Sequence, residues 1–290
     1  NPIMTTRGCP FNCEFCCVCD LYGKKIRHIP VKNVVRDIVD SGRKYFIFLD
    51  DNIIGDTRYA TELFSAINPL KIKWIGQASI SFVKNEKLIK QAVDSGCEGL
   101  FFGLETVSPS HLKRLRKSFT EIEKVEEAIK RIEDYGIYFH PSLIFGFDDD
   151  TKDVFVETLD FLDKNNISSA SLNVLTPYPG TQIFQQFKRE GRLLTTNWKH
   201  YDHSTAVFRP KNMTARELQE GRLWAKKEFT ALPAVLKRMV HHLDRPLYHL
   251  ALNLGAHKTI RNEIKLFPEL LTTIYNNLPV GSFSKKLAGT

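Results

Sequence analysis

The sequence contains no apolar stretch close to the roughly 20 residues that a membrane-spanning helix needs. Its start shows no signal-peptide pattern either, because the first residues run directly into a group of cysteines. Internal repeats and low-complexity linkers are also missing. The hydrophobic fraction of 42% and the charged fraction of 26% are ordinary for a globular chain with a sizeable core. We therefore expect a cytoplasmic protein.

Cysteines are few and unevenly placed. Five of the six lie between positions 9 and 19, and the sixth is Cys97. The disulfide framework of a secreted domain would spread its cysteines through the chain, so this distribution argues against one. A tight group in an intracellular chain is typical of metal binding or redox chemistry. Isolated Cys97 fits a small buried hydrophobic residue.

The positive charge is confined to the C-terminal part. The chain has a net charge of +8, yet residues 1–208 contain 27 Lys/Arg and 27 Asp/Glu, whereas residues 209–290 contain 14 and 6. The sequence has no stretch in which basic residues are interleaved with aromatic ones, so nothing in it indicates nucleic-acid binding. The excess predicts either solvated helix surface or an amphipathic surface in peripheral contact with an anionic membrane. Adjacent His241 and His242 point to different helix faces, which argues against a metal site there.

Apolar patterns alternate between strand and helix along the first two thirds of the chain. Strands are predicted at 3–6, 45–49, 73–78, 100–104, 138–147 and 170–175. The run 45–49 is continuously apolar, as in strands that are buried on both faces of a parallel sheet. Six strand–helix units favour parallel strands with right-handed crossovers, whereas a complete barrel needs eight units.

We therefore predict an α/β fold: an open, partial (β/α)6 TIM-like barrel over residues 1–185. A mostly α-helical C-terminal extension is predicted over residues 186–290, in which Leu232, Val235, Leu236, Met239 and Val240 form an amphipathic pattern. The chain starts at Asn1 rather than Met, within a predicted strand. We therefore expect a fragment of a longer protein.

Cys9, Cys13 and Cys16 have the spacing C-x3-C-x2-C directly after the first predicted strand. Three thiolates from one loop can hold three irons of a [4Fe–4S] cubane and leave the fourth iron without a protein ligand. The amino and carboxylate groups of S-adenosylmethionine (SAM) can chelate that iron. Two alternatives remain open: a zinc site that includes His28, or a four-thiolate electron-transfer cluster that adds Cys17 or Cys19.

The motif resembles the CX3CXΦC signature of the radical SAM superfamily, with Phe15 at the aromatic position that lies near the adenine in that family. The run 8–17, together with Phe48-Leu-Asp-Asp-Asn52 and the segments 103–105, 145–147 and 175–181, is similar to the cobalamin-dependent branch. That branch includes hopanoid methylases and the anaerobic bacteriochlorophyll cyclase. The resemblance implies a cobalamin-binding domain upstream of Asn1.

Polar residues follow the predicted strands, where the chemistry of a parallel barrel is located. They can supply a carboxylate for the amino group of SAM, partners for the ribose hydroxyls, and a glycine where backbone approaches adenine. The candidates are Asp50, Asp51, Asn52, Gln77, Glu105, Ser142, Gly146 and Asn173. By resemblance, residues 50–52 take the place of the family's Gly-Gly-Glu segment, and Glu105 and Gly146 match further SAM contacts. As the alternative, residues 50–52 are ordinary turn residues and Glu105 is a solvated loop acid.

The resemblance implies a radical SAM enzyme in which Cys9, Cys13 and Cys16 are the catalytic metal ligands. Reductive cleavage of SAM would give a 5′-deoxyadenosyl radical, used for cobalamin-dependent methylation or a related change at an unactivated carbon of a hydrophobic, lipid-like substrate. An external electron donor of the flavodoxin or ferredoxin type is implied as well. The alternative function is a non-catalytic zinc- or iron–sulfur-binding protein.

Overall fold

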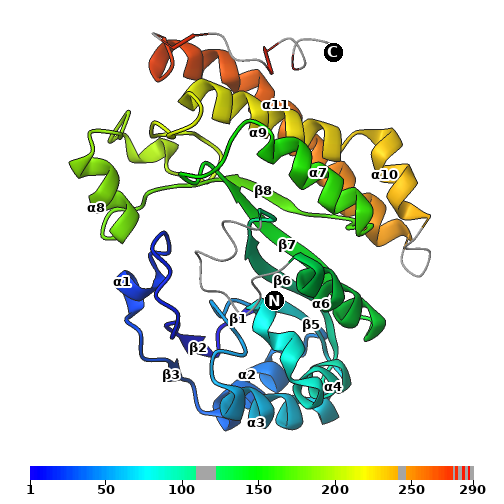
Figure 1. Ribbon diagram of the computed structural model, residues 1–290. Helices are drawn as coiled ribbons and strands as arrows, with labels where there is room; N and C mark the ends of the chain where they lie inside the picture. Colours follow the sequence, from blue (N-terminus) through cyan, green and yellow to red (C-terminus); the bar gives the residue numbers. More distant parts are fainter. Residues whose placement is uncertain (109–121, 241–245, 277, 280–282, 285–286, 288–290) are drawn as a thin grey trace. The chain divides into compact units, whose positions relative to one another are not determined.

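The computed structural model describes residues 1–108, 122–240, 246–276, 278–279, 283–284 and 287 (Figure 1). The chain forms two compact units. Unit 1 comprises residues 1–104 and 112–141, and unit 2 comprises residues 105–111 and 142–290, in each case as far as they are described. These units do not test the predicted division at residue 185, which stays a prediction. His241 and His242, for which the sequence argues against a metal site, lie outside the described residues.

Six strands form one sheet in the order β1-β4-β5-β6-β7-β8. The paired strands β1/β4, β4/β5, β5/β6 and β7/β8 are parallel. Their bounds are β1 Pro2–Ile3, β4 Tyr45–Phe48, β5 Lys73–Ala78, β6 Cys97–Glu105, β7 Tyr138–Phe145 and β8 Ser171–Val174. The order ends at β1 and β8 without closing, which confirms the predicted α/β class and the open, partial barrel.

The first predicted strand is divided into two. β1 joins the large sheet, whereas β2 (Thr6–Arg7) pairs antiparallel with β3 (Arg27–His28) in a separate two-stranded sheet. β3 was not predicted, because two residues are too short to give a periodic signal. The pair β2/β3 brings together the two ends of the segment that contains the clustered cysteines.

Most helices of unit 1 follow the predicted alternation with the strands, and two of them begin at side-chain caps, Asp56 and Asn85. The helices of this unit are α1 (Val18–Tyr22), α2 (Val31–Ser41), α3 (Thr57–Ile67), α4 (Glu86–Asp94) and α6 (Ile122–Asp134), with short 3-10 turns η1 (Asn68–Leu70) and η2 (Ile80–Lys84). Asp56 accepts hydrogen bonds from the amides of Arg58 and Tyr59 at the start of α3. Such a cap contributes about 1 kcal/mol.

Trp74 on β5 is the centre of the unit 1 core and is only 1% exposed. Its ring packs edge-on against Phe48 and stacks on Phe64 of α3, with centroids 5.1 and 5.3 Å apart. The indole Nε1 donates to Ser95 Oγ at 3.1 Å, so the buried polar atom is satisfied. This core fixes β4 and β5 against the helices that follow them.

The prediction that the run 45–49 is buried on both faces is wrong. Phe46 and Phe48 are buried, but Tyr45, Ile47 and Leu49 are 71%, 47% and 47% exposed. Helices cover one face of the strand, and the alternating side chains of the opposite face remain accessible. A continuous apolar run therefore marks the exposed inner face of an open sheet here rather than a strand between two helical layers.

Unit 2 contains the end of β7, β8 and the predicted helical extension. Its helices are α7 (Val154–Lys164), α8 (Gln182–Arg189), α9 (Ala215–Phe229), α10 (Leu232–Met239) and α11 (Pro246–Thr273), with the 3-10 turn η3 (Trp198–His200). The guanidinium of Arg222 on α9 donates to the carbonyl of Leu172 on β8 at 2.9 Å and pairs with Glu263 on α11. These contacts tie the helices to the sheet. No helix in the described part of the chain is both long and apolar enough to cross a membrane.

Candidate functional site

The clustered cysteines lie on the segment of unit 1 between β2 and β3, here called the cysteine loop (residues 8–26), which includes α1 with Cys19. A turn in which the amide of Cys16 donates to the carbonyl of Cys13 at 3.1 Å folds the loop back on itself. Cys9, Cys13 and Cys16 are all half-buried. Burial, with smaller contributions from the thiols of Cys13, Cys17 and Cys9, raises the pKa of Cys16 to about 12, although a backbone hydrogen bond at Val18 lowers it. Burial also raises the pKa of Cys9, with contributions from Cys19, Cys13 and Asp51.

The donor set fits a [4Fe–4S] cluster. The thiols of the three motif cysteines are close enough to affect one another's pKa, and they lie on one partly shielded loop. In residues 1–108 and the other described segments, no three His, Cys, Asp or Glu side chains converge into a cage for a single metal ion. That finding does not bear on a cubane, because its thiolates bind three different irons. Cys9, Cys13 and Cys16 could therefore hold the cluster that the motif predicts.

The other residues considered as ligands have different surroundings. The thiol of Cys19 donates to the carbonyls of Phe11 at 2.8 Å and Cys9 at 3.5 Å, so it lies over the start of the loop. His28, the fourth ligand of the zinc alternative, instead places Nε2 3.2 Å from the carboxylate of Asp56. Phe15 lies half-buried within the loop. Cys97 is buried, as predicted.

The backbone at Gly8 explains how the loop starts. Gly8 has φ +98°, and a Cβ atom there would lie 2.7 Å from the carbonyl oxygen of Lys25. The entering and returning segments of the loop therefore touch at Gly8, at a distance that only glycine allows. Next to it, Cys9 is fixed close to the point where the loop leaves the β2/β3 pair.

The three polar residues after β4 have three different roles. Asp50 is fully buried and accepts hydrogen bonds from Thr5 and Thr6. Asp51 accepts a hydrogen bond from the amide of Gly8 and lies close enough to Cys9 to raise its pKa. Asn52 is buried, and its side-chain oxygen accepts from the amide of Ser79 at 3.2 Å.

Among these residues, Asp51 is the carboxylate that the fold brings to the cysteine loop. Burial raises the pKa of Asp51, while the hydrogen bond from Gly8 lowers it and Asp50 raises it. Gln77, on β5, is exposed on the same face of its strand as Ile75. Unit 1 thus brings Cys9, Cys13, Cys16 and Asp51 together, with Gln77 at the end of a neighbouring strand.

The remaining candidates lie in unit 2. Asn173 on β8 donates to Ser142 Oγ on β7 at 3.1 Å, so these two predicted site residues are neighbours. Glu105 is 9% exposed, has φ +71°, and lies close enough to His203 to affect its pKa, which burial lowers overall. His203 was not predicted, and it shares a 3.1 Å contact with the hydroxyl of Tyr178.

Gly146 ends β7 in a tight turn. It has φ +104°, and a Cβ atom would lie 2.8 Å from Leu218 and 3.0 Å from Phe208. Asp150, which is 4% exposed, accepts from the amides of Gly146 at 2.8 Å and Phe147 at 3.0 Å. Asp150 was missed because three consecutive aspartates at 148–150 look alike in the sequence, and only the turn distinguishes the one that caps it.

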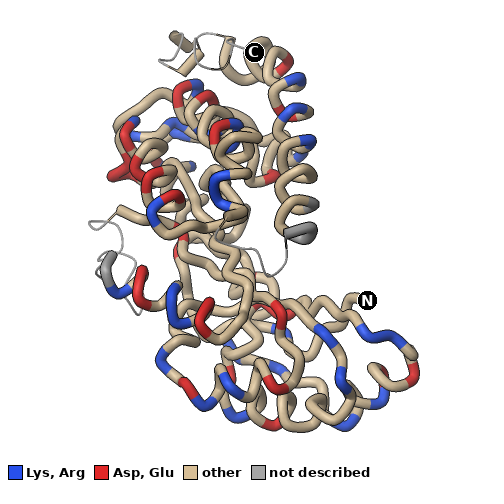
Figure 2. Tube along the Cα trace, turned by 90° about the vertical axis from the view of Figure 1, so that its right-hand side faces the viewer, with Lys and Arg blue, Asp and Glu red and all other residues tan. Residues whose placement is uncertain are grey.

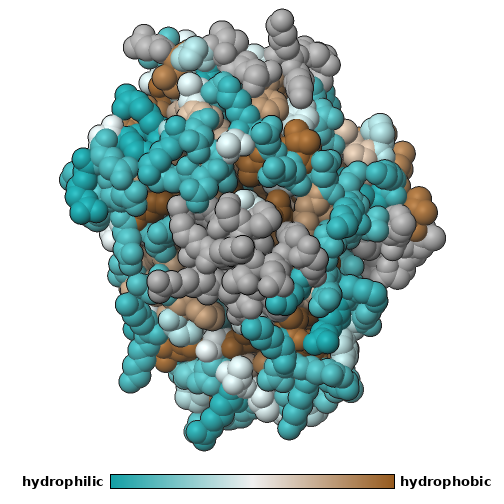
Figure 3. All heavy atoms as spheres, viewed as in Figure 1, coloured by the Kyte–Doolittle hydropathy of each residue, from teal (hydrophilic) through white to brown (hydrophobic). Residues whose placement is uncertain are grey.

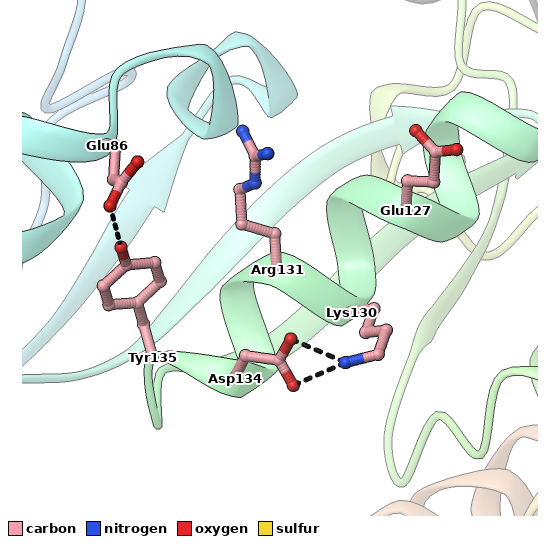
Figure 4. Close-up of a pocket in the computed structure, with 6 residues that line it drawn as sticks. All are labelled: Glu86, Glu127, Lys130, Arg131, Asp134 and Tyr135. Atoms are coloured by element: carbon pink, nitrogen blue, oxygen red, sulfur yellow. Dashed lines mark hydrogen bonds and ion pairs between the residues drawn. The ribbon is translucent and has the colours of Figure 1, made fainter.

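A separate hollow on unit 1 does not coincide with any predicted site residue (Figure 4). Its charges are paired internally: Lys130 with Asp134 at 2.7 Å, and the hydroxyl of Tyr135 with Glu86 at 2.8 Å. The lining residues, from α4 and from α6 with the turn after it, are Glu86, Glu127, Lys130, Arg131, Asp134 and Tyr135. Because four of these six groups pair with one another and none of the six is a predicted site residue, the cysteine loop remains the candidate site.

Residues 3–162 match the Radical SAM superfamily, and the chain belongs to this superfamily. It is 31% identical over 244 residues to bacteriochlorophyllide d C-12(1)-methyltransferase of Chlorobaculum tepidum. This match covers 82% of this chain and 53% of that protein. It is 24% identical over 253 residues to hopanoid C-2 methylase of Rhodopseudomonas palustris, covering 82% and 48%. The chain thus spans about half the length of these curated relatives.

The fold is similar to that of the cobalamin-dependent SAM radical enzyme OxsB, solved with aqua-cobalamin and SAM bound. The TM-score is 0.62 at 18% identity, and the match covers 98% of this chain and 51% of OxsB. The predicted family and fold are therefore confirmed. The individual site residues stay predictions.

Proposed function

We propose that this protein cleaves SAM reductively to a 5′-deoxyadenosyl radical and methionine. The observation that carries the proposal is the placement of three half-buried thiols on one loop with the carboxylate of Asp51 beside Cys9. A [4Fe–4S] cluster held by Cys9, Cys13 and Cys16 supplies the electron and an open iron for the amino and carboxylate groups of SAM. Membership of the Radical SAM superfamily supports this reading.

The other residues of the proposed site bind and orient SAM. Asp51 accepts a hydrogen bond from the α-amino group, because among residues 50–52 its carboxylate is the one that raises the pKa of the Cys9 thiol. Phe15 lies against the adenine. In unit 1, Gln77 is a further proposed contact. For Glu105, Ser142, Gly146 and Asn173, which belong to unit 2, contact with SAM stays a prediction from the sequence. For Asp50 and Asn52, the hydrogen bonds to Thr5, Thr6 and Ser79 favour a supporting role over direct contact.

We propose further that the radical serves a methylation that uses cobalamin bound by a preceding domain. Support comes from relatives that are named as methyltransferases and from the cobalamin-dependent OxsB. A hydrophobic, lipid-like substrate is favoured because those relatives are named for a bacteriochlorophyllide and for hopanoids. The reaction needs an external one-electron donor of the flavodoxin or ferredoxin type. Residues 1–185 form the catalytic part in this proposal.

Cluster binding is tested by anaerobic reconstitution with iron and sulfide. We expect about four irons and four sulfides per chain, with the visible absorbance of an iron–sulfur cluster. Cys13→Ala loses this cluster, whereas Cys97→Ala, at a buried cysteine outside the loop, retains it. Cys19→Ala also retains it, and if it does not, the ligand assignment is wrong. Stoichiometric zinc with no cluster would contradict the proposal.

Peripheral membrane contact through the C-terminal helices belongs to the same proposal. α10 was predicted to be amphipathic, but Leu232, Leu236 and Val240 point outward and are 56%, 52% and 65% exposed. On neighbouring α11, Leu254 is 53% exposed. In Figure 3, apolar side chains reach the surface among hydrophilic ones, and in Figure 2 both basic and acidic segments lie along the C-terminal helices. Residues 209–290 contain 14 Lys/Arg and 6 Asp/Glu. Exposed leucines flanked by Lys and Arg are typical of interfacial helices.

Vesicle co-sedimentation tests this contact. We expect binding to vesicles that contain anionic lipid, weaker binding to neutral vesicles, and loss at high salt, which screens surface charge. Leu236→Glu should weaken binding about tenfold or more, because it removes an inserted apolar group and adds a negative charge. Val39→Glu is the matched control, since Val39 is 58% exposed on α2 of unit 1. Equal losses in both variants would contradict the contact.

A further inference from the structure

The cysteine loop is held at a narrow base, here called the loop neck: Thr5 and Thr6 on the entering side, His28 and Ile29 on the returning side. The β2/β3 pair joins Thr6 to His28, and the amide of Ile29 donates to the carbonyl of Thr5 at 2.8 Å. From α3, the hydroxyl of Tyr59 donates to the carbonyl of Ile29 at 2.6 Å. Hydrogen bonds therefore join the two sides of the neck, and the clustered cysteines lie in the segment between them.

Asp50 fixes the entering side of this neck. Its carboxylate accepts from the hydroxyl of Thr5 at 2.7 Å, the hydroxyl of Thr6 at 2.5 Å and the amide of Thr5 at 3.2 Å. Asp50, Thr5 and Thr6 are all buried, at 0%, 0% and 5% exposure. Burial of a carboxylate is unfavourable unless such donors satisfy it, so each of these bonds holds the neck to the end of β4.

Asp50 and Asp51 are adjacent, and their side chains engage two different parts of the same loop. Asp50 binds the neck, whereas Asp51 accepts from the amide of Gly8 and approaches Cys9. The distance between the thiol of Cys9 and the carboxylate of Asp51 therefore depends on how the adjacent residues Asp50 and Asp51 hold the loop. A shift of the neck relative to β4 would move Cys9 while Asp51 stayed with the strand.

We propose that Asp50 is a positioning residue: through Thr5 and Thr6 it holds the loop neck so that Cys9 keeps its place relative to Asp51. This inference rests on the proposed function, in which Cys9 holds the cluster and Asp51 binds the amino group of SAM. Asp50 itself touches neither group, because its carboxylate is turned into the protein. Asp50 and Asp51 thus have different roles in this proposal.

The test compares Asp50→Asn and Thr6→Val with Ser95→Ala. Thr6→Val removes one hydroxyl donor to Asp50 and keeps the size of the side chain. Ser95→Ala is a matched control: Ser95 is 2% exposed, and its hydroxyl bonds to Trp74 in the same unit but away from the loop. Two quantities are measured on each reconstituted protein. One is the rate at which a chelator removes iron, and the other is the change in the electron paramagnetic resonance spectrum of the reduced cluster when SAM is added.

We expect Thr6→Val and Asp50→Asn to lose iron about tenfold faster than Ser95→Ala at an equal fall in melting temperature, because each weakens a charge-assisted bond. Their spectral response to SAM should also require higher SAM concentrations. If both variants match Ser95→Ala in iron release and SAM response, Asp50 is only structural and the inference is wrong. If the unaltered protein takes up no cluster, the proposed function fails first, so the two failures are distinguishable.

Discussion

Gly8 and Gly23 offer a matched pair of substitutions at the base of the cysteine loop. Both have positive φ, +98° and +80°. A Cβ atom at Gly8 would lie 2.7 Å from the carbonyl oxygen of Lys25, whereas a Cβ atom at Gly23 would meet nothing within 4 Å. Alanine therefore introduces backbone strain at both positions, but it disturbs the close approach of the loop's two sides only at Gly8.

The expected energies differ for this reason. Positive φ costs alanine about 1–3 kcal/mol at either position, and Gly23, with ψ 169°, lies in a region that essentially only glycine occupies. Contact with a backbone oxygen adds about 1–3 kcal/mol at Gly8 alone. A whole domain is stable by only about 5–15 kcal/mol, and the loop residues that follow buried Gly8 are half-buried or exposed, so the loop yields before the core does. Gly8→Ala should displace Cys9 without unfolding unit 1.

Iron content after anaerobic reconstitution, together with the melting temperature, measures this effect. We expect Gly23→Ala to load iron like the unaltered protein and Gly8→Ala to lose most of its iron, with melting temperatures that differ little. Normal loading of Gly8→Ala would refute the close approach as a requirement of the site. Equal loss in Gly23→Ala would show that backbone strain alone explains the result.

Two further predictions concern packing and pH. Gly221→Ala on α9 gains about 1 kcal/mol of helix propensity, but its Cβ would lie 2.2 Å from the ring of fully buried Phe155. Overpacking therefore dominates, and we expect a lower melting temperature that Phe155→Leu in the same chain partly restores; a higher melting temperature for Gly221→Ala would contradict this packing. Since burial raises the pKa of Cys16 to about 12, its thiol is protonated at neutral pH and must lose a proton to bind iron. The initial rate of cluster loading should therefore rise from pH 7 to pH 9, by up to about tenfold per pH unit, and a flat or falling profile would count against rate-limiting deprotonation. The stability of the iron-free protein should change in the opposite direction. Above pH 9 the thiol ionises in the unfolded chain but stays protonated in the folded one, so the free energy of unfolding should fall.

The order of strands and helices could be predicted because each element has a local pattern of apolar residues. Strand β5 and helix α3, for example, appear where the alternation and the Asp56 cap indicate them. The exposure of Ile47 could not be predicted, because it depends on whether a second layer covers the inner face of the sheet. The same holds for Leu236, which a helical pattern alone places among buried neighbours.

The cysteine ligands were predictable from spacing, whereas the roles of the polar residues were not. Asp50 and Asp51 are chemically identical and adjacent, and only the path of the chain from β1 into β2, past the end of β4, decides which binds Thr5 and which approaches Cys9. His203 and Asp150 were missed for the same reason. Each acts through contacts with residues that lie far away in sequence or within a turn whose geometry the sequence does not specify.

The most direct test of the central claim is the formation of 5′-deoxyadenosine. The protein is reconstituted anaerobically, reduced with dithionite, mixed with SAM, and the products are quantified by liquid chromatography with mass spectrometry. We expect 5′-deoxyadenosine and methionine in equal amounts from the unaltered protein and none from Cys13→Ala. A fully loaded cluster that leaves SAM intact, in a protein that binds SAM, would contradict the proposed reaction.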